Sequence, residues 1–243
     1  MLGPLLFLLY INDLPGEIYN YISLFADDLK MFAPSSTPEA NQNDLDSLKT
    51  WQDMWLLNFN QKDEKCKVMH VGKGNPCAQY QLNDTNLPVV TSEKDLGVTV
   101  TNTLDWGDHI GNCINKAKQC IGWISRSVIS RSPSVMLNIY KTLIRPHLEY
   151  CVQVWSPYPR YGNWETIKSI ENVQRMFTRL IDGIGLLSYE ERLHKLNLTT
   201  LLERRARGDL IETYRIVSGI ANYGSNLFAV SRNGHLTLPS GKG

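Results

Sequence analysis

The chain has 243 residues, of which 42% are hydrophobic and 20% charged, values that are ordinary for a globular protein of one large or two small domains. Its five cysteines lack the spacing of a disulfide framework, which excludes a small disulfide-stapled fold and fits a reducing compartment. Residues 1–64 carry three Lys/Arg and ten Asp/Glu, a net charge of −7, whereas residues 65–243 carry 22 Lys/Arg and 14 Asp/Glu, a net charge of +8. This asymmetry suggests an acidic site joined to a basic surface, and scattered solvated charge explains it equally well.

The first apolar run, MLGPLLFLLY, resembles neither a signal peptide nor a membrane span. It has no basic region and no small-residue cleavage site, and it is too short to cross a bilayer as a helix. We therefore expect a core helix or strand between Leu5 and Tyr10, where periodicity does not decide between the two. With no secretion signal or transmembrane segment, the protein is expected inside the cell, in the cytoplasm or the nucleus.

Two neighbouring aspartates interrupt the apolar stretch YISLFADDLKMF at residues 21–32. Tyr21–Phe25 is strand-like and Leu29–Phe32 is a second apolar run, so Asp27 and Asp28 are predicted at the tip of a hairpin. Turn chemistry explains one aspartate more easily than two. Two carboxylates in one turn can also act as acid and base, or they can bind a hard divalent cation such as Mg²⁺, which would remove their mutual repulsion.

Short elements follow up to about residue 103. Apolar residues at helical spacing predict an amphipathic helix from Glu39 to about Phe59. Strands are expected at Cys66–Val71, Tyr80–Leu82 and Leu96–Val100, between loops rich in Gly, Asn and Pro.

Helices dominate the remainder of the chain. One helix is expected over Ile110–Val128, a second from Ser132-Pro133 to near Pro146, and a third over Glu165–Leu180. Two more should begin at the capping-box patterns Ser188…Glu191 and Thr200…Glu203. The fold class is therefore α+β, with residues 1–103 mixed, residues 104–220 all-helical and residues 221–243 a frayed tail.

Phe25-Ala26-Asp27-Asp28 resembles the Phe/Tyr-x-Asp-Asp motif of reverse transcriptases. Four more segments, in the family's order, resemble those of jockey-like non-LTR retrotransposons: residues 2–15 the stretch after the Gln-Gly pair of motif B, residues 51–72 motif D, residues 93–110 the primer grip, and residues 140–157 the helical thumb. The resemblance extends to about residue 220. It implies a partial polymerase palm of antiparallel hairpins plus a helix over residues 1–103, followed by a helical thumb and C-terminal region.

The resemblance also implies catalytic roles. In such polymerases two Mg²⁺ ions activate the primer 3′-hydroxyl and stabilise the leaving pyrophosphate. Asp27 would be the principal metal ligand and Asp28 the weaker or indirect one, and Phe25 would pack beside the primer end. Lys65 matches the lysine of motif D, which assists the leaving group, and it is equally well explained as a surface lysine at the start of a strand.

Further residues would contact nucleic acid. Leu96, Gly97 and Val98 correspond to the hairpin that holds the primer terminus, or to an ordinary turn. Thumb-like helices carry cations for phosphate contacts, each of which could instead be a solvated charge; they include Lys116, Lys118 and Arg126.

The implied function is RNA-templated DNA synthesis with an RNA template, a DNA primer and deoxynucleotides. The motif A carboxylate and the fingers have no counterpart in the sequence, so Mg²⁺ should bind weakly and the isolated chain should be inactive. The missing N-terminal polymerase part is then an expected partner. The alternative is a nucleic-acid-binding module that uses only the basic helical half.

Overall fold

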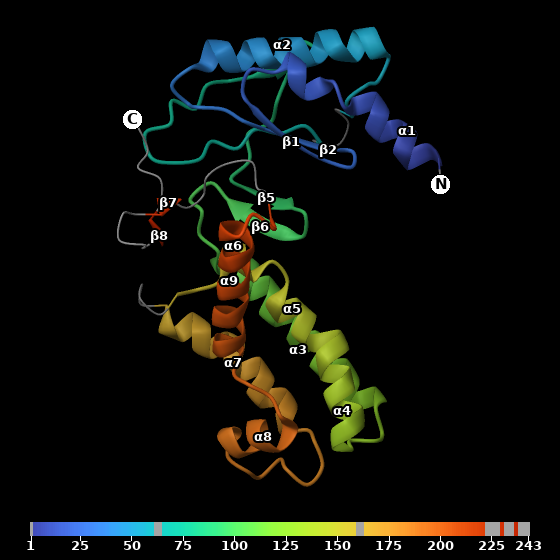
Figure 1. Cartoon of the computed structure of the whole chain (residues 1–243), viewed down its shortest axis with the longest axis vertical. Helices are drawn as coiled ribbons and strands as arrows, with labels where there is room; N and C mark the ends of the chain where they lie inside the picture. Colours follow the sequence, from blue (N-terminus) through green and yellow to red (C-terminus); the bar gives the residue numbers. More distant parts are fainter. Residues whose placement is uncertain (1, 61–64, 159–162, 222–228, 231–235, 238–243) are drawn as a thin grey trace. The chain divides into compact units, whose positions relative to one another are not determined.

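The computed structural model describes residues 2–60, 65–158, 163–221, 229–230 and 236–237. The structure is α+β, as predicted (Figure 1). The chain divides into two compact units, Met1–Asp105 and Trp106–Gly243, and each is described by itself. Most of the expected tail, residues 221–243, lies outside the described residues; within it, strands β7 (Ala229–Val230) and β8 (Leu236–Thr237) form an antiparallel pair.

Helices and antiparallel hairpins make up the described part of the first unit. Its elements in chain order are α1 (Leu2–Ile11), the 3-10 helix η1 (Leu14–Glu17), β1 (Tyr21–Phe25), β2 (Asp28–Phe32), α2 (Pro38–Trp55), β3 (Gln81–Leu82), β4 (Thr85–Asn86), β5 (Ser92–Asp95) and β6 (Val98–Thr101). The strands pair as β1 with β2, β3 with β4, and β5 with β6.

The core of the first unit lies between α2 and one face of the β1–β2 hairpin. On α2, Leu45, Leu48 and Trp51 are buried at helical spacing. Side chains alternate between the two faces of a strand, so every second hairpin residue reaches this core; those that pack against it are Ile22, Leu24, Leu29 and Met31. The hairpin is therefore held against α2 by its inner face.

A buried carboxylate on α2 holds the chain just before β1. Asp44 is 4% exposed, and its two oxygens accept hydrogen bonds of 2.9 Å from the backbone N–H groups of Tyr19 and Asn20. The Asn20 side chain donates a third bond, of 2.7 Å, to the same carboxylate. These bonds satisfy a charged group that would otherwise be costly to bury, and they fix where β1 begins.

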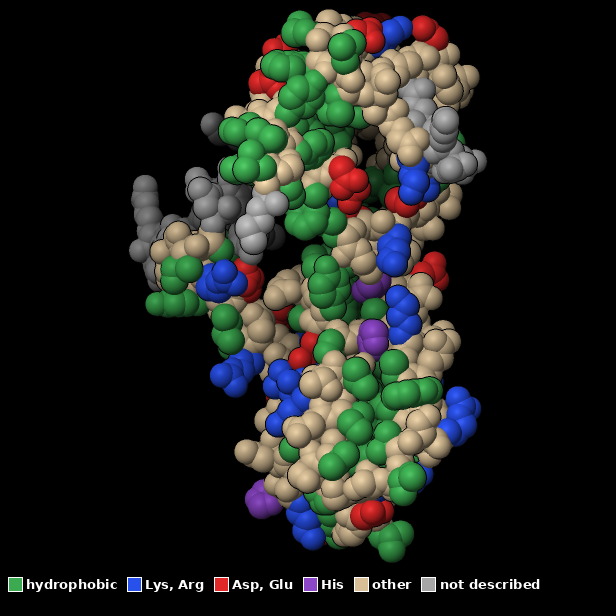
Figure 2. Space-filling model, turned by 90° about the vertical axis from the view of Figure 1, so that its right-hand side faces the viewer, with side chains coloured by type: hydrophobic (Ala, Val, Ile, Leu, Met, Phe, Trp, Pro, Cys, Tyr) green, Lys and Arg blue, Asp and Glu red, His purple; other side chains and the backbone are tan. Residues whose placement is uncertain are grey.

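Helix α1 corrects the expectation of a core element at Leu5–Tyr10. The segment is helical, but Ile11 is its one buried residue among those described. The sequence is apolar around the whole helix, and only one side of it can contact the rest of the unit. The remaining leucines form an exposed apolar patch, seen in the upper part of Figure 2; its members are Leu2, Leu5, Leu6, Leu8 and Leu9.

Three further expectations for the first unit were inaccurate. Helix α2 ends at Trp55, not near Phe59, because Leu56 adopts a left-handed conformation with φ +54°. The segment Cys66–Val71 is not a strand: it contributes one isolated parallel bridge, between Val68 and Val89. The expected strand at Leu96–Val100 begins only at Val98, because Leu96 and Gly97 form a turn. All three differences arise from backbone geometry that apolar spacing does not encode.

The described part of the second unit is built almost entirely of helices. These are α3 (Gly107–Ser127), α4 (Pro133–Ile139), the π-helical turn η3 (Tyr140–Ile144), α5 (Arg145–Glu149), α6 (Val152–Trp155), α7 (Trp164–Thr178), α8 (Tyr189–Leu196) and α9 (Leu201–Val217). Helix α3 contacts both α5 and α7, and α9 contacts α6 and α7. No described helix is long and apolar enough to span a membrane.

The helix that begins at Pro133 does not stop at Pro146 as expected. It widens into a π turn over Tyr140–Ile144 and continues as α5 through the proline to Glu149. Proline has no N–H and its ring presses on the carbonyl four residues earlier, and here the wider turn lies directly before it. Tyr140, Ile144 and Leu148 are all fully buried, so the whole stretch keeps one face in the core.

Both predicted capping boxes are confirmed. The Ser188 hydroxyl accepts a hydrogen bond from the N–H of Glu191, and the Glu191 carboxylate accepts one from the N–H of Ser188. Thr200 and Glu203 make the same reciprocal pair at the start of α9. Each box satisfies two backbone donors that a helix start leaves without partners.

Candidate functional site

The predicted hairpin around the two aspartates is present. Strands β1 and β2 pair in register from Tyr21 with Phe32 to Phe25 with Asp28, and Ala26 and Asp27 form the turn between them. Ala26 has φ +52°, a value in the left-handed region that glycine adopts more easily than alanine. An alanine there costs about 1–2 kcal/mol.

The turn lets two neighbouring carboxylates share one end of the hairpin. Asp27 lies in the turn, and Asp28 opens β2 opposite Phe25. Both aspartates are exposed, and so is Phe25, at 60%. By strand alternation Phe25 and Asp28 lie on the outer face, opposite the face that packs on the core.

An ion pair joins this hairpin to the β5–β6 hairpin. Lys30 of β2 pairs with Asp95, the last residue of β5. The next two residues, Leu96 and Gly97, form the turn of the second hairpin with φ +43° and φ +90°. The structure thus brings the predicted primer-grip residues into the same region as the paired aspartates.

Leu96 and Gly97 are exposed, whereas Val98 is buried at 5%. The predicted trio therefore divides between a turn that is open to contacts and a residue that anchors β6 in the unit. Gly97 is suited to its place because glycine tolerates positive φ.

A second ion pair lies beside Lys65. The Lys67 ammonium is 2.6 Å from a Glu93 carboxylate oxygen, and the hydrogen bond from Lys67 lowers the pKa of Glu93, with a smaller contribution from Lys65 in the same direction. Lys65 itself is exposed. The charges of two lysines therefore act on β5, the strand that also carries Asp95.

The donor set at the hairpin tip is suited to a hard cation. Mg²⁺ is commonly held by one or two carboxylates and completes its shell with water and substrate phosphates. Asp27 and Asp28 supply two carboxylates open to solvent, and no group of three His, Cys, Asp or Glu side chains that could hold a metal occurs among the described residues. Asp13, a carboxylate on the N-terminal side of the hairpin, accepts a hydrogen bond from Trp51 instead.

Comparison with known proteins identifies related polymerases. The chain is 24% identical over 216 residues, 84% of its length, to a "Probable RNA-directed DNA polymerase from transposon X-element" of Drosophila melanogaster. It is 27% identical over 64% of its length to the RNA-directed DNA polymerase from mobile element jockey of the same species, and 25% identical over 75% to that of Drosophila funebris. The chain is similar to the RNA-directed DNA polymerases of jockey-like non-LTR retrotransposons.

The chain spans about a fifth of the length of these curated polymerases, since the matches cover 23%, 18% and 21% of them. No family model matches the chain. No solved structure matches it either. The similarity to jockey-like polymerases therefore rests on sequence, and the roles of individual residues are proposals.

The three predicted phosphate contacts of the second unit, Lys116, Lys118 and Arg126, all lie on α3 and are exposed. Lys116 and Lys118 are two residues apart, which places them about 160° apart around the helix. They cannot both face one nucleic-acid strand as a single row. Helix α3 thus presents cations on more than one side.

Sequence reasoning missed the residues that hold this region together. Lys30 follows Asp28 by two positions and so shares its face, which the alternation of β2 could have indicated. Its partner Asp95 could not have been found in this way, because the pairing joins residues 65 positions apart through tertiary packing. The Lys67–Glu93 pair likewise had no local signal.

Proposed function

We propose that the chain carries the later palm motifs and the thumb of a retrotransposon reverse transcriptase and takes part in RNA-templated DNA synthesis. The observation that carries the proposal is the hairpin with Asp27 and Asp28 at its tip, next to a second hairpin whose turn is Leu96–Gly97. Sequence similarity to the polymerases named above supports it.

The paired carboxylates would hold Mg²⁺, with Asp27 as the principal ligand and Asp28 as the weaker one. When bound, the metal would activate a primer 3′-hydroxyl and stabilise the leaving pyrophosphate. Phe25 would pack beside the primer end from the same face of the hairpin. The backbone at Gly97 would approach the primer terminus closely, as a residue without Cβ permits.

Lys65 would serve as the cation that assists the leaving group. It is exposed, and its charge adds to the effect of Lys67 in lowering the pKa of Glu93 on β5. A compact ammonium on a flexible stem suits a role in which the group moves with the substrate.

The 243-residue chain alone is proposed to be inactive. Two-metal catalysis depends on holding both ions in register with the substrate, and the described residues offer no third metal-binding side chain beside the aspartates. RNA template, DNA primer and deoxynucleotides would be bound only together with a polymerase part that supplies this ligand and the nucleotide pocket.

The test has two arms. In the first, Mn²⁺ is used as a paramagnetic probe for the Mg²⁺ position: it should broaden the NMR signals of the β1–β2 turn in the chain, and Asp27→Asn should abolish the broadening. Broadening that is unchanged in the variant would remove the proposed metal site.

In the second arm, a template–primer extension assay with Mg²⁺ compares the chain with Asp27→Asn. Neither should extend the primer. Robust extension by the chain that disappears in Asp27→Asn would contradict the proposed inactivity. If the genomic sequence before Met1 encodes a matching frame with a further carboxylate strand, the longer product should extend the primer and its Asp27→Asn variant should not.

A second candidate function is nucleic-acid binding by the helical unit alone. It is favoured by the exposed cations of α3, which point to more than one side of the helix. RNA affinity that falls steeply with salt in the Asp27→Asn variant would support it, and a flat response or no binding at low salt would reject it.

A further inference from the structure

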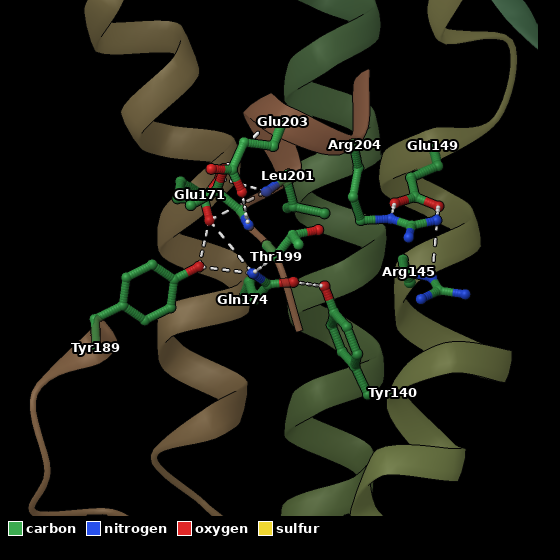
Figure 3. A network of polar contacts seen from close by, with 11 residues as sticks. Tyr140, Arg145, Glu149, Glu171, Gln174, Tyr189, Thr199, Leu201, Glu203 and Arg204 are labelled. Atoms are coloured by element: carbon green, nitrogen blue, oxygen red, sulfur yellow. Dashed lines mark hydrogen bonds and ion pairs between the residues drawn. The ribbon is translucent and has the colours of Figure 1, made fainter. Parts of the chain in front are cut away.

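Tyr189, at the start of α8, is held rigidly by its hydroxyl. The ring is buried, at 8% exposure. Its hydroxyl donates to the Glu171 carboxylate and accepts a 2.7 Å hydrogen bond from the side-chain amide of Gln174, both on α7 (Figure 3). Glu171 in turn accepts a 2.9 Å bond from the N–H of Leu201, the first residue of α9. The ring is thus fixed by a network that spans three helices.

Two guanidinium groups lie against this fixed ring. The Cζ atom of Arg175 is 4.6 Å from the centroid of the Tyr189 ring, and that of Arg192 is 5.6 Å from the same centroid. Cations are attracted to the face of an aromatic ring at such distances. Because the ring is held in place, the positions of both arginines are restricted before any ligand binds.

Arg179 adds a third positive charge. It follows Arg175 by four residues at the end of α7, so the two Cβ atoms lie about 5–6 Å apart on one side of the helix. Both Arg175 and Arg179 are exposed. Two guanidinium groups in this arrangement can contact one phosphate group or two successive ones.

Arg192 is the buried member of the cluster, at 2% exposure. Its Nη1 donates bonds of 2.9 Å to the carbonyl of Arg175 and to the hydroxyl of Thr178, which caps the C-terminal end of α7. Its Nε has no hydrogen-bond acceptor among the described residues. This capping role explains the position of Arg192. It does not explain why its Nε lacks an acceptor, nor why Arg175 and Arg179 lie exposed beside it.

The positive charge of the cluster is poorly balanced. None of the three arginines forms an ion pair with a carboxylate in the described part of the chain. Burial lowers the pKa of Arg192, and Arg179 and Arg175 act in the same direction, against opposing effects of Tyr189 and Glu190. The C-terminal end of a helix supplies only about half a negative charge, which leaves a local excess of positive charge.

We propose that Arg175 and Arg179, backed by Arg192, form a binding site for the phosphate groups of a nucleic-acid backbone. Arginine matches phosphate oxygens with a planar pair of donors. The Tyr189 ring is buried and cannot stack on a base, so the contact is to the backbone and independent of sequence. The choice of nucleic acid over a free phosphate ion rests on the proposed function, whereas the arginine cluster itself does not.

The test is the binding of a mixed-sequence single-stranded RNA of about 20 nucleotides by the full chain, measured by fluorescence anisotropy over a series of salt concentrations. The double variant Arg175→Gln/Arg179→Gln should bind RNA about tenfold more weakly at low salt. The slope of log K against log salt should also become shallower by about 1.4, which is about 0.7 for each phosphate that is no longer neutralised. The matched control Lys168→Gln/Arg207→Gln removes two exposed charges from α7 and α9 and should retain the salt dependence of the parent chain.

Equal losses in the two double variants would overturn the site, because net charge alone would then explain the binding. So would a polyglutamate competitor that displaces RNA as well as an oligonucleotide of the same charge, since the site would then be one for acidic peptides. Displacement by inorganic phosphate beyond that by chloride of equal ionic strength would overturn the choice of a backbone over a free ion.

The variant Arg175→Lys/Arg179→Lys keeps the charge and the helix but loses the planar donor pair. It should show an intermediate affinity, and it retains the test if the glutamine variant fails to fold. Asp27→Asn should leave RNA binding at this site unchanged, so failure of the polymerase proposal and failure of this one are distinguishable.

Discussion

Ala26 adopts a backbone conformation that alanine disfavours. It occupies a left-handed position, with φ +52°, between two strands and immediately before the paired aspartates. Strained residues tend to occur at functional sites, where the surrounding structure maintains them. Here the pairing of Phe25 with Asp28 and the packing of the inner hairpin face hold the turn.

Replacing Ala26 with glycine should relieve this strain. We expect Ala26→Gly to raise the free energy of unfolding by about 1 kcal/mol, since glycine adopts positive φ without a steric penalty but loses more entropy on folding. Urea denaturation measures the change. The control Ala33→Gly, at a position without positive φ, should be neutral or destabilising, and equal gains at both positions would contradict the role of φ.

At the scale of single elements, local sequence signals were most accurate where the stabilising groups are neighbours in the chain. The two capping boxes depend on side chains three residues apart, and both are present. The β1–β2 hairpin follows from alternation and a two-residue turn. By contrast, α2 ends at a left-handed leucine, and the sequence has no glycine there to indicate the end of a helix. The Val68–Val89 bridge depends on packing between distant segments.

The capping box of α8 also makes a prediction about pH. The Ser188 hydroxyl, followed by the Ser188 backbone, lowers the pKa of Glu191 below its usual value of 4.5. A carboxyl whose folded pKa is depressed contributes stability that is present above pH 4.5 and is lost as the pH falls through the folded value. Glu191→Gln keeps a side chain that can complete the box but cannot titrate.

The free energy of unfolding of Glu191→Gln should therefore depend less on pH below 4.5 than that of the parent chain. Chemical denaturation at a series of pH values measures this. In a Ser188→Ala background the substitution should have a smaller effect, because the main cause of the shift is gone. Identical pH profiles for the parent and the single variant would contradict the assignment.

For the whole molecule, the sequence indicated the change from a mixed unit to a helical one, but not which apolar residues are buried. Helix α1 has the composition of a core element, yet Leu2 and Leu9 are each 69% exposed. Burial is decided by which surfaces meet in three dimensions, and a segment that is apolar on all sides carries no information about that. The Lys30–Asp95 pair could not be predicted from the sequence for the same reason, because it too depends on which surfaces meet in three dimensions.

The exposed side of α1 should make the isolated chain self-associate. Leu5→Gln/Leu9→Gln should reduce association without unfolding the first unit, since both side chains are exposed. Light scattering coupled to size-exclusion chromatography measures the mass distribution. The control Leu104→Gln/Leu186→Gln alters two exposed leucines outside α1 and should leave association unchanged; an equal effect would show that general hydrophobicity, and not α1, is responsible.

The π turn at Tyr140–Ile144 has a consequence for insertions and deletions. A π turn holds one residue more than an α turn, so removing the exposed Leu143 could restore a regular helix. Because the π turn accommodates the additional residue, the segments on its two sides should keep their relative orientation after this deletion, whereas a deletion within a regular α-helix rotates one side against the other by about 100°. Met136, Tyr140 and Leu148 should then all remain buried, so this stretch should tolerate the loss of one residue that a regular helix such as α3 would not.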